Sequence, residues 1–99
     1  MEADHQTLCL NMIVKNEVSV IARCLASVRP IIDHWVIVDT GSTDGTQDAI
    51  RTLMADLPGE LHERPWRDFA HNRTEALELA RPRGEYVLWI ARSGETEDR

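Results

Sequence analysis

Two periods of apolar residues alternate along the chain. Short stretches that are apolar at nearly every position are typical of strands buried on both faces of a parallel sheet. Longer stretches in which apolar residues return every three or four positions are typical of helices with one buried face. The first pattern predicts strands at 8–14 (LCLNMIV), 34–39 (HWVIVD) and 85–90 (EYVLWI), and a short strand is expected at 60–64. The second pattern predicts helices at 18–28, 46–57 and 68–80. Asp68 is the expected N-cap of the third helix, and its inner face is expected to carry Phe69, Ala76, Leu77 and Ala80.

These elements follow one another in the order β-α-β-α-β-α-β, with short connections between them. Such an alternation predicts an α/β fold in which helices cover both faces of a mostly parallel, four-stranded sheet. Residues 91–99 (ARSGETEDR) are polar and show neither period. We therefore expect a single domain over residues 1–90, followed by a disordered polar tail at 91–99.

Composition narrows the classes of function that such a domain can serve. The 99 residues include 17 acidic and 11 basic side chains, and the resulting net charge of −6 argues against a nucleic-acid clamp. No apolar run approaches the length of a membrane span, and the first residues lack the layout of a secretory signal. Cys9 and Cys24 form neither a metal cluster nor a disulfide framework. We therefore expect a soluble, cytoplasmic protein.

Polar residues follow the first two predicted strands, where an open α/β sheet binds its ligands. Lys15, Asn16 and Glu17 come directly after the first strand, and Asp39 ends the second. The Asp39 carboxylate has two possible roles, because it can accept hydrogen bonds from a base or ribose, or from the backbone of the loop that follows. The residues in that loop, 42–44, are ordinary helix-capping types.

Three segments resemble one known family. M-I-V-K-N-E at 12–17, V-I-V-D-T-G-S-T-D-G-T at 36–46 and W-R-D-F-A-H-N-R-T-E-A-L at 66–77 are similar to family 2 glycosyltransferases with the GT-A fold. The resemblance covers residues 8–90 and is to the N-terminal, nucleotide-binding half of that fold. It implies a three-layer, Rossmann-like GT-A half-domain that binds a nucleotide-diphosphate sugar, most simply a UDP-sugar. In the intact family this sugar is transferred to an acceptor hydroxyl.

The resemblance also implies roles for individual residues. Asp39 matches an acidic residue that hydrogen-bonds the nucleoside, although Thr40 stands where many relatives have a second acid. Lys15-Asn16-Glu17 matches a loop that lines the nucleotide pocket. Arg73 matches a basic position that faces the donor, and its rigid fork suits phosphate or carbonyl oxygens. A solvated arginine is the alternative for Arg73, which has no acid three or four residues away to pair with.

The family's metal site is where this sequence departs most. Relatives follow the fourth strand with an acid-x-acid motif that holds Mg²⁺ or Mn²⁺ on the donor diphosphate, whereas here the residues are Ala91-Arg92-Ser93. The expected metal ligands are therefore missing. We expect a truncated or diverged form, weakly active or inactive alone, and we assign no catalytic residue.

Two other functions fit parts of the sequence. A nucleotide-binding or purely structural α/β module without turnover fits the same elements. The V-D-T-G-S segment also resembles a dimeric aspartic protease, in which Asp39 of two subunits would share a proton, but the three helical periods argue against that all-β fold. We interpret Trp35 and Trp89 as core or sheet-edge packing residues. Trp66 precedes the third helix and could approach the donor, but we favour core packing for it as well. We also expect self-association through the edge of the fourth strand, 86–90.

Overall fold

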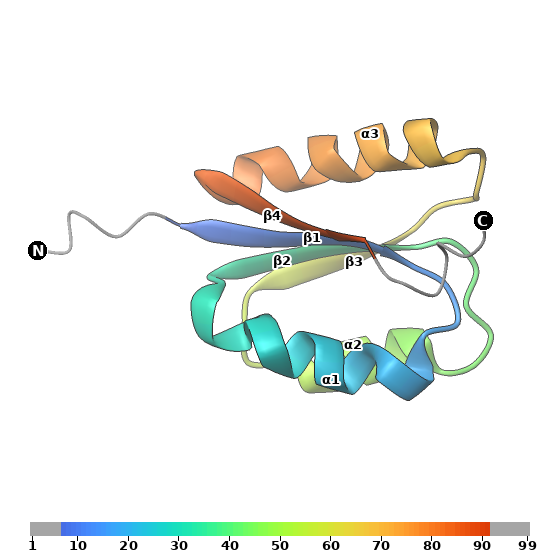
Figure 1. The fold of residues 1–99 in the computed structure, drawn as a ribbon, viewed down its shortest axis with the longest axis horizontal. Helices are drawn as coiled ribbons and strands as arrows, with labels where there is room; N and C mark the ends of the chain where they lie inside the picture. The colour runs from blue at the N-terminus through green and yellow to red at the C-terminus, as the bar shows by residue number, and fades with distance from the viewer. Residues whose placement is uncertain (1–6, 92–99) are drawn as a thin grey trace, which may run out of the picture.

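Four parallel strands form one sheet in the order β3-β2-β1-β4 (Figure 1). The computed structural model describes residues 7–91. Within them the strands are β1 (Leu8–Val14), β2 (His34–Asp39), β3 (Gly59–Glu63) and β4 (Tyr86–Ala91). The helices are α1 (Val18–Val28), α2 (Thr46–Leu53) and α3 (Phe69–Ala80), with short 3₁₀ turns at Arg29–Ile31 and Arg81–Arg83. The predicted α/β architecture with a parallel four-stranded sheet is confirmed.

The helices form the two outer layers of the molecule. Helices α1 and α2 cover one face of the sheet, and α3 covers the opposite face (Figure 1). The chain runs outward from β1 through β2 to β3, then crosses back over the other face through α3 to place β4 on the free side of β1. The direction of winding therefore reverses between β1 and β4, and such a switch point is where open α/β sheets bind ligands.

The larger part of the core lies between the sheet and helices α1 and α2. Ile21 and Leu25 of α1 are fully buried there, as the helical period predicts, together with Met12 and Ile37 of the sheet. Trp35 also belongs to this core, as expected, and its indole Nε1 donates to the Leu57 carbonyl at 3.0 Å. The opposite face has a smaller core.

The buried face of helix α3 differs in part from the predicted one. Ala76 and Ala80 are buried as predicted, whereas Phe69 is 47% exposed and Asn72 takes the inner position. Asn72 is held there because its Oδ1 accepts from the Arg67 amide at 2.8 Å and its Nδ2 donates to the Pro65 carbonyl at 3.1 Å. These bonds fix the segment that leads into α3. The predicted N-cap, Asp68, is confirmed, since its carboxylate accepts from the His71 amide at 2.7 Å.

Helix α2 ends one turn earlier than its period predicts. The sequence favours a helix to residue 57, but α2 ends at Leu53 and the chain continues as a turn. Side chains from elsewhere take the carbonyls in this region, since Arg29 Nη1 donates to Leu53 O at 2.8 Å and the Trp35 indole donates to Leu57 O. Local periodicity carries no information about these distant donors.

The parallel arrangement excludes the aspartic-protease interpretation, because Asp39 ends an inner strand of an α/β sheet rather than lying in an all-β dyad.

Within residues 7–91, no helix is long and apolar enough to cross a membrane. The tail was expected at 91–99, but Ala91 belongs to β4, and residues 92–99 lie outside the described residues.

Candidate functional site

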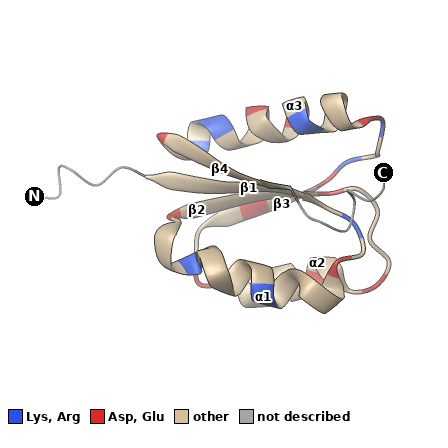
Figure 2. Ribbon diagram, viewed as in Figure 1, with Lys and Arg blue, Asp and Glu red and all other residues tan. Residues whose placement is uncertain are grey.

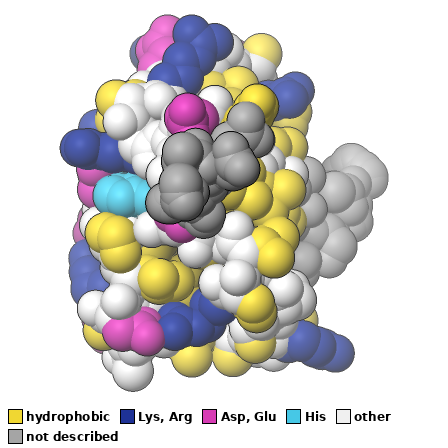
Figure 3. Space-filling model, turned by 90° about the vertical axis from the view of Figure 1, so that its left-hand side faces the viewer, with side chains coloured by type: hydrophobic (Ala, Val, Ile, Leu, Met, Phe, Trp, Pro, Cys, Tyr) yellow, Lys and Arg dark blue, Asp and Glu magenta, His cyan; other side chains and the backbone are white. Residues whose placement is uncertain are grey.

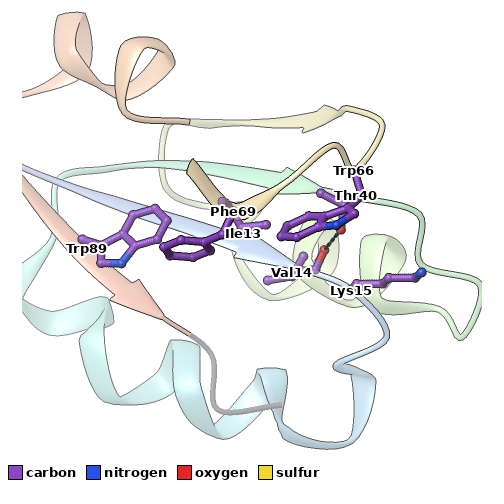
Figure 4. A pocket seen from close by; sticks show the side chains of 7 residues that line it. All are labelled: Ile13, Val14, Lys15, Thr40, Trp66, Phe69 and Trp89. Carbon is purple, nitrogen blue, oxygen red and sulfur yellow. Dashed lines mark hydrogen bonds between the residues drawn. The ribbon is translucent and has the colours of Figure 1, made fainter. Parts of the chain in front are cut away.

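A cavity of about 210 Å³ lies at the carboxyl ends of the strands, at the reversal between β1 and β4 (Figure 4). Its walls come from the ends of β1, β2 and β4 and from the segment that leads into α3. The lining residues are Ile13, Val14, Lys15, Thr40, Trp66, Phe69 and Trp89. Six of these seven side chains present apolar or aromatic surface or a hydroxyl, and Lys15 is the charged one.

Three aromatic rings form most of one wall. Trp66, Phe69 and Trp89 follow one another along the cavity in Figure 4. Phe69 and Trp89 meet edge to face, with ring centroids 6.4 Å apart. Trp66 is 51% exposed, so the interpretation of Trp66 as a core residue is wrong, and Trp89 serves the cavity as well as the sheet. The sequence could have indicated this exposure, because Trp66 lies between two predicted elements and belongs to the apolar pattern of neither.

Arg73 stands beside this aromatic wall. Its guanidinium carbon lies 5.2 Å from the centroid of the Trp89 ring, a cation–π contact. The guanidinium is thereby held next to a residue that lines the cavity, which fits the predicted position near the donor. Arg73 is nevertheless exposed to solvent, so its role toward a donor stays a prediction.

The three residues after β1 divide into two roles. Lys15 lines the cavity and is exposed. Asn16 instead ties this loop to the β2–α2 loop, because its amide donates to Ser42 Oγ and its Oδ1 accepts from the Thr43 amide, both at 2.8 Å. The Glu17 amide donates to Thr46 Oγ1, also at 2.8 Å. Asn16 and Glu17 thus hold two loops together at the edge of the site.

Asp39 is fully buried, and it is not among the residues that line the cavity. Its Oδ1 accepts from the amides of Gly41 and Ser42, both at 2.8 Å, and from Gln47 Nε2 at 2.9 Å. Its Oδ2 is enclosed without a hydrogen-bond partner. Burial alone would raise the pKa of this carboxyl, but the hydrogen bonds from Ser42, Gly41 and Gln47 outweigh burial and hold the pKa below its ordinary value.

Thr40 lines the cavity where Asp39 does not. Successive residues of a strand point to opposite faces, and Ile37 faces α1 and α2, so Asp39 shares that side and Thr40 turns toward the side of α3. The Thr40 hydroxyl donates to the Val14 carbonyl at 3.3 Å (Figure 4). Sequence reasoning missed Thr40, although the alternation along β2 could have found it.

Comparison with known proteins places these features in a family. The model of glycosyl transferase family 2 matches residues 9–91, nearly the whole described part of the chain. The chain belongs to glycosyl transferase family 2. The family assignment confirms the resemblance seen in the three sequence motifs, and the four-stranded parallel sheet agrees with the N-terminal half of a GT-A fold.

Curated relatives of this family 2 domain include two glycosyltransferases and one repeat-containing protein. The SPbeta prophage-derived glycosyltransferase SunS of Bacillus subtilis is 31% identical over 90 residues, which is 90% of this chain and 20% of the relative. The glycosyltransferase SunS of Bacillus phage SPbeta gives the same figures. A TPR repeat-containing protein of Synechococcus elongatus is 37% identical over 83 residues, 83% of this chain and 19% of the relative. The chain therefore spans about a fifth of the length of these relatives.

Family 2 glycosyltransferases are generally metal-dependent. A metal site in this domain would require carboxylates at the cavity that are free to bind a divalent cation. The seven lining residues include no carboxylate. Asp39 already accepts three hydrogen bonds through Oδ1, and its Oδ2 is closed off from solvent. Across the described residues, no group of three or more His, Cys, Asp or Glu side chains could hold a metal ion. The residues at this cavity do not fit a divalent cation.

Proposed function

We propose that this domain binds a nucleotide-diphosphate sugar donor, a UDP-sugar, with the base against the wall of Trp66, Phe69 and Trp89. The observation that carries the proposal is the position of an aromatic cavity at the switch point of a glycosyl transferase family 2 sheet. Bases stack well on aromatic side chains because every base has a flat π-face. A cavity walled by rings therefore suits a nucleoside.

The residues of the site have two roles in this proposal. Lys15 and Arg73 face the donor, whereas Asn16, Glu17 and Asp39 act by holding the loops that shape the cavity. Any further contact between Asp39 and the nucleoside stays a prediction. The reaction of a full-length protein would break the bond from the anomeric carbon to the diphosphate and form one to the acceptor oxygen, whose proton passes to a base that we do not assign.

A nucleotide-binding module without turnover is the second candidate. The observation that favours it is the composition of the wall, because its seven residues include no carboxylate or histidine able to take a proton from an acceptor at neutral pH. Both candidates require the nucleotide to bind. Hydrolysis or transfer assays with a UDP-sugar separate them, since only the transferase releases UDP.

Binding of UDP tests the proposed function directly. We expect UDP to quench tryptophan fluorescence, because Trp66 and Trp89 line the cavity. Trp66→Ala is expected to weaken UDP binding by about tenfold through loss of base stacking. Trp66→Phe, which keeps a stacking surface, should retain most of the affinity. Because Trp66 is half exposed, neither change should lower the melting temperature noticeably. Equal affinity of wild type and Trp66→Ala would contradict the aromatic base site.

The two edges of the sheet differ in a way that supports the expected self-association. Edge strands are protected from pairing by charged side chains. At one edge, β3 carries Glu60, His62 and Glu63, whereas β4 at the other edge has no charged residue between Tyr86 and Ala91 (Figure 2). Hydrophobic side chains gather on the β4 side of the amino end of the sheet (Figure 3). We propose that a second copy pairs along β4.

Light scattering at high concentration measures this association. We expect wild type to form dimers, and Tyr86→Lys to shift the population to monomers, because Tyr86 is 54% exposed at the open edge. Val18→Lys is a matched control, since Val18 is 40% exposed on α1, away from that edge. A wild-type chain that stays monomeric throughout the concentration series argues against pairing along β4.

A further inference from the structure

We infer that this domain neutralises the diphosphate of its donor with the side-chain cations of Lys15 and Arg73, without a divalent cation. The inference rests on the proposed function, because it concerns how the same cavity receives the nucleotide. It follows from the disagreement between a generally metal-dependent family and a cavity whose wall does not fit a metal.

The charge at the cavity is opposite in sign to the net charge of the chain. The chain carries a net charge of −6, yet the one charged residue among the seven that line the cavity is a lysine. Lys15 stands beside Trp66 at one end of the row of aromatic rings, and Trp89 at the other end carries Arg73 (Figure 4). A dianionic or trianionic ligand therefore meets a cation from either direction and no carboxylate in the wall.

Neither cation is committed to a carboxylate within residues 7–91. Arg64 shows the contrast on the same side of the sheet, because its guanidinium pairs with Glu75 of α3 at 3.2 Å. Arg73 lies two residues before Glu75 on the same helix, so the two side chains point in different directions, and the Arg73 guanidinium lies over the Trp89 ring instead. The positions three and four residues from Arg73 are Phe69, Ala70, Ala76 and Leu77, so its own helix places no acid at the spacings that pair side chains. Its charge is available to a ligand.

The Trp89 ring places Arg73 before any ligand arrives. A guanidinium stacked on a ring has fewer orientations to lose when it binds, and it keeps its planar fork of donors for phosphate oxygens. The apolar surface around the cavity also strengthens attraction between opposite charges relative to bulk water. These two effects supply, from the protein's own side chains, the charge neutralisation that a metal ion supplies in other sites.

The experiment is a titration of the full chain with UDP, in EDTA and in excess Mn²⁺. We expect the same Kd within about twofold in both conditions, and a weaker Kd as sodium chloride is raised, since ion pairs are screened by salt. Lys15→Ala and Arg73→Ala are each expected to weaken UDP binding about tenfold, as charge-assisted hydrogen bonds to phosphate are lost. Arg73→Lys, which keeps the charge but not the fork, should fall between.

Two controls separate charge neutralisation from general damage. Arg81→Ala removes an exposed arginine beyond the end of α3 and should leave the UDP affinity unchanged. Uridine lacks phosphates, so its affinity should not respond to Lys15→Ala or Arg73→Ala. If the two variants weaken uridine and UDP equally, the cations do not act on the phosphates and the inference is wrong.

The outcomes also separate this inference from the proposed function. If UDP binds only when Mn²⁺ is present, the metal-free inference fails while nucleotide binding stands. If UDP binds in neither condition, both fail together. Binding that is equal in EDTA and Mn²⁺, and that depends on Lys15 and Arg73, supports both.

Discussion

Replacing Asp39 with alanine should lower the free energy of unfolding by about 3 kcal/mol, because it leaves three partly buried hydrogen-bond donors without their charged acceptor. The donors are the Gly41 and Ser42 amides and the Gln47 side chain. For a domain of this size the loss corresponds to a fall in melting temperature of roughly 12–24 °C. Thermal and urea unfolding followed by circular dichroism measure it. A melting temperature within a few degrees of wild type would show that Asp39 does not hold the loop.

Asp39→Asn is the matched variant, because it keeps the shape and one carbonyl acceptor but loses the charge. The pKa of Asp39 lies below its unfolded value of 3.8, so the ionised carboxylate stabilises the fold. That contribution is present above the unfolded pKa and is lost as the pH falls through the folded pKa. We therefore expect the stability difference between wild type and Asp39→Asn to be largest near neutral pH and to shrink in strong acid.

The asparagine variant also decides whether Asp39 contacts the nucleoside. If Asp39 acts only through the loop, folded Asp39→Asn should bind UDP nearly as well as wild type. A large loss of affinity in a variant that stays folded would show a direct contact, as the family resemblance implies. The full burial of Asp39 and the three donors on its Oδ1 lead us to expect the first result.

Gly59→Ala should destabilise the domain by about 2–3 kcal/mol, since it forces extra volume against a packed core. A Cβ built at Gly59 would lie 2.1 Å from atoms of the Trp35 indole. Trp35 cannot move away easily, because it is buried and its indole donates to Leu57 O at 3.0 Å. Urea unfolding of wild type and variant measures the difference.

Gly45→Ala is the control for Gly59→Ala. Nothing lies within 4 Å of a Cβ at Gly45, so the substitution adds no clash, although its φ of +94° makes alanine strained by about 1 kcal/mol. We expect Gly45→Ala to be the milder change. Equal stability of Gly59→Ala and wild type would mean that β3 shifts away from the indole at little cost.

The type and order of the elements could be predicted from the sequence because each depends on residues close together in the chain. The apolar run at 8–14 gives β1 with the same bounds, and the helical period at 18–28 gives α1. The early end of α2 could not be predicted, because Arg29 and Trp35, which take carbonyls near that end, are distant in sequence. Phe69 was placed wrongly for a similar reason, since Asn72 is drawn inward by bonds to the segment at 65–67.

The candidate site was likewise predicted in part from the sequence and decided in part by the tertiary structure. That Lys15 and Asp39 end neighbouring strands follows from the sequence, together with the family that its three motifs indicate. Only the tertiary structure decided that Thr40 rather than Asp39 lines the cavity, and that Trp66, Phe69 and Trp89 share one wall. Periodicity records which residues are buried along one element. A cavity wall is assembled from separate segments, whose meeting depends on strand order and on how α3 packs across the sheet, and no local pattern contains that information.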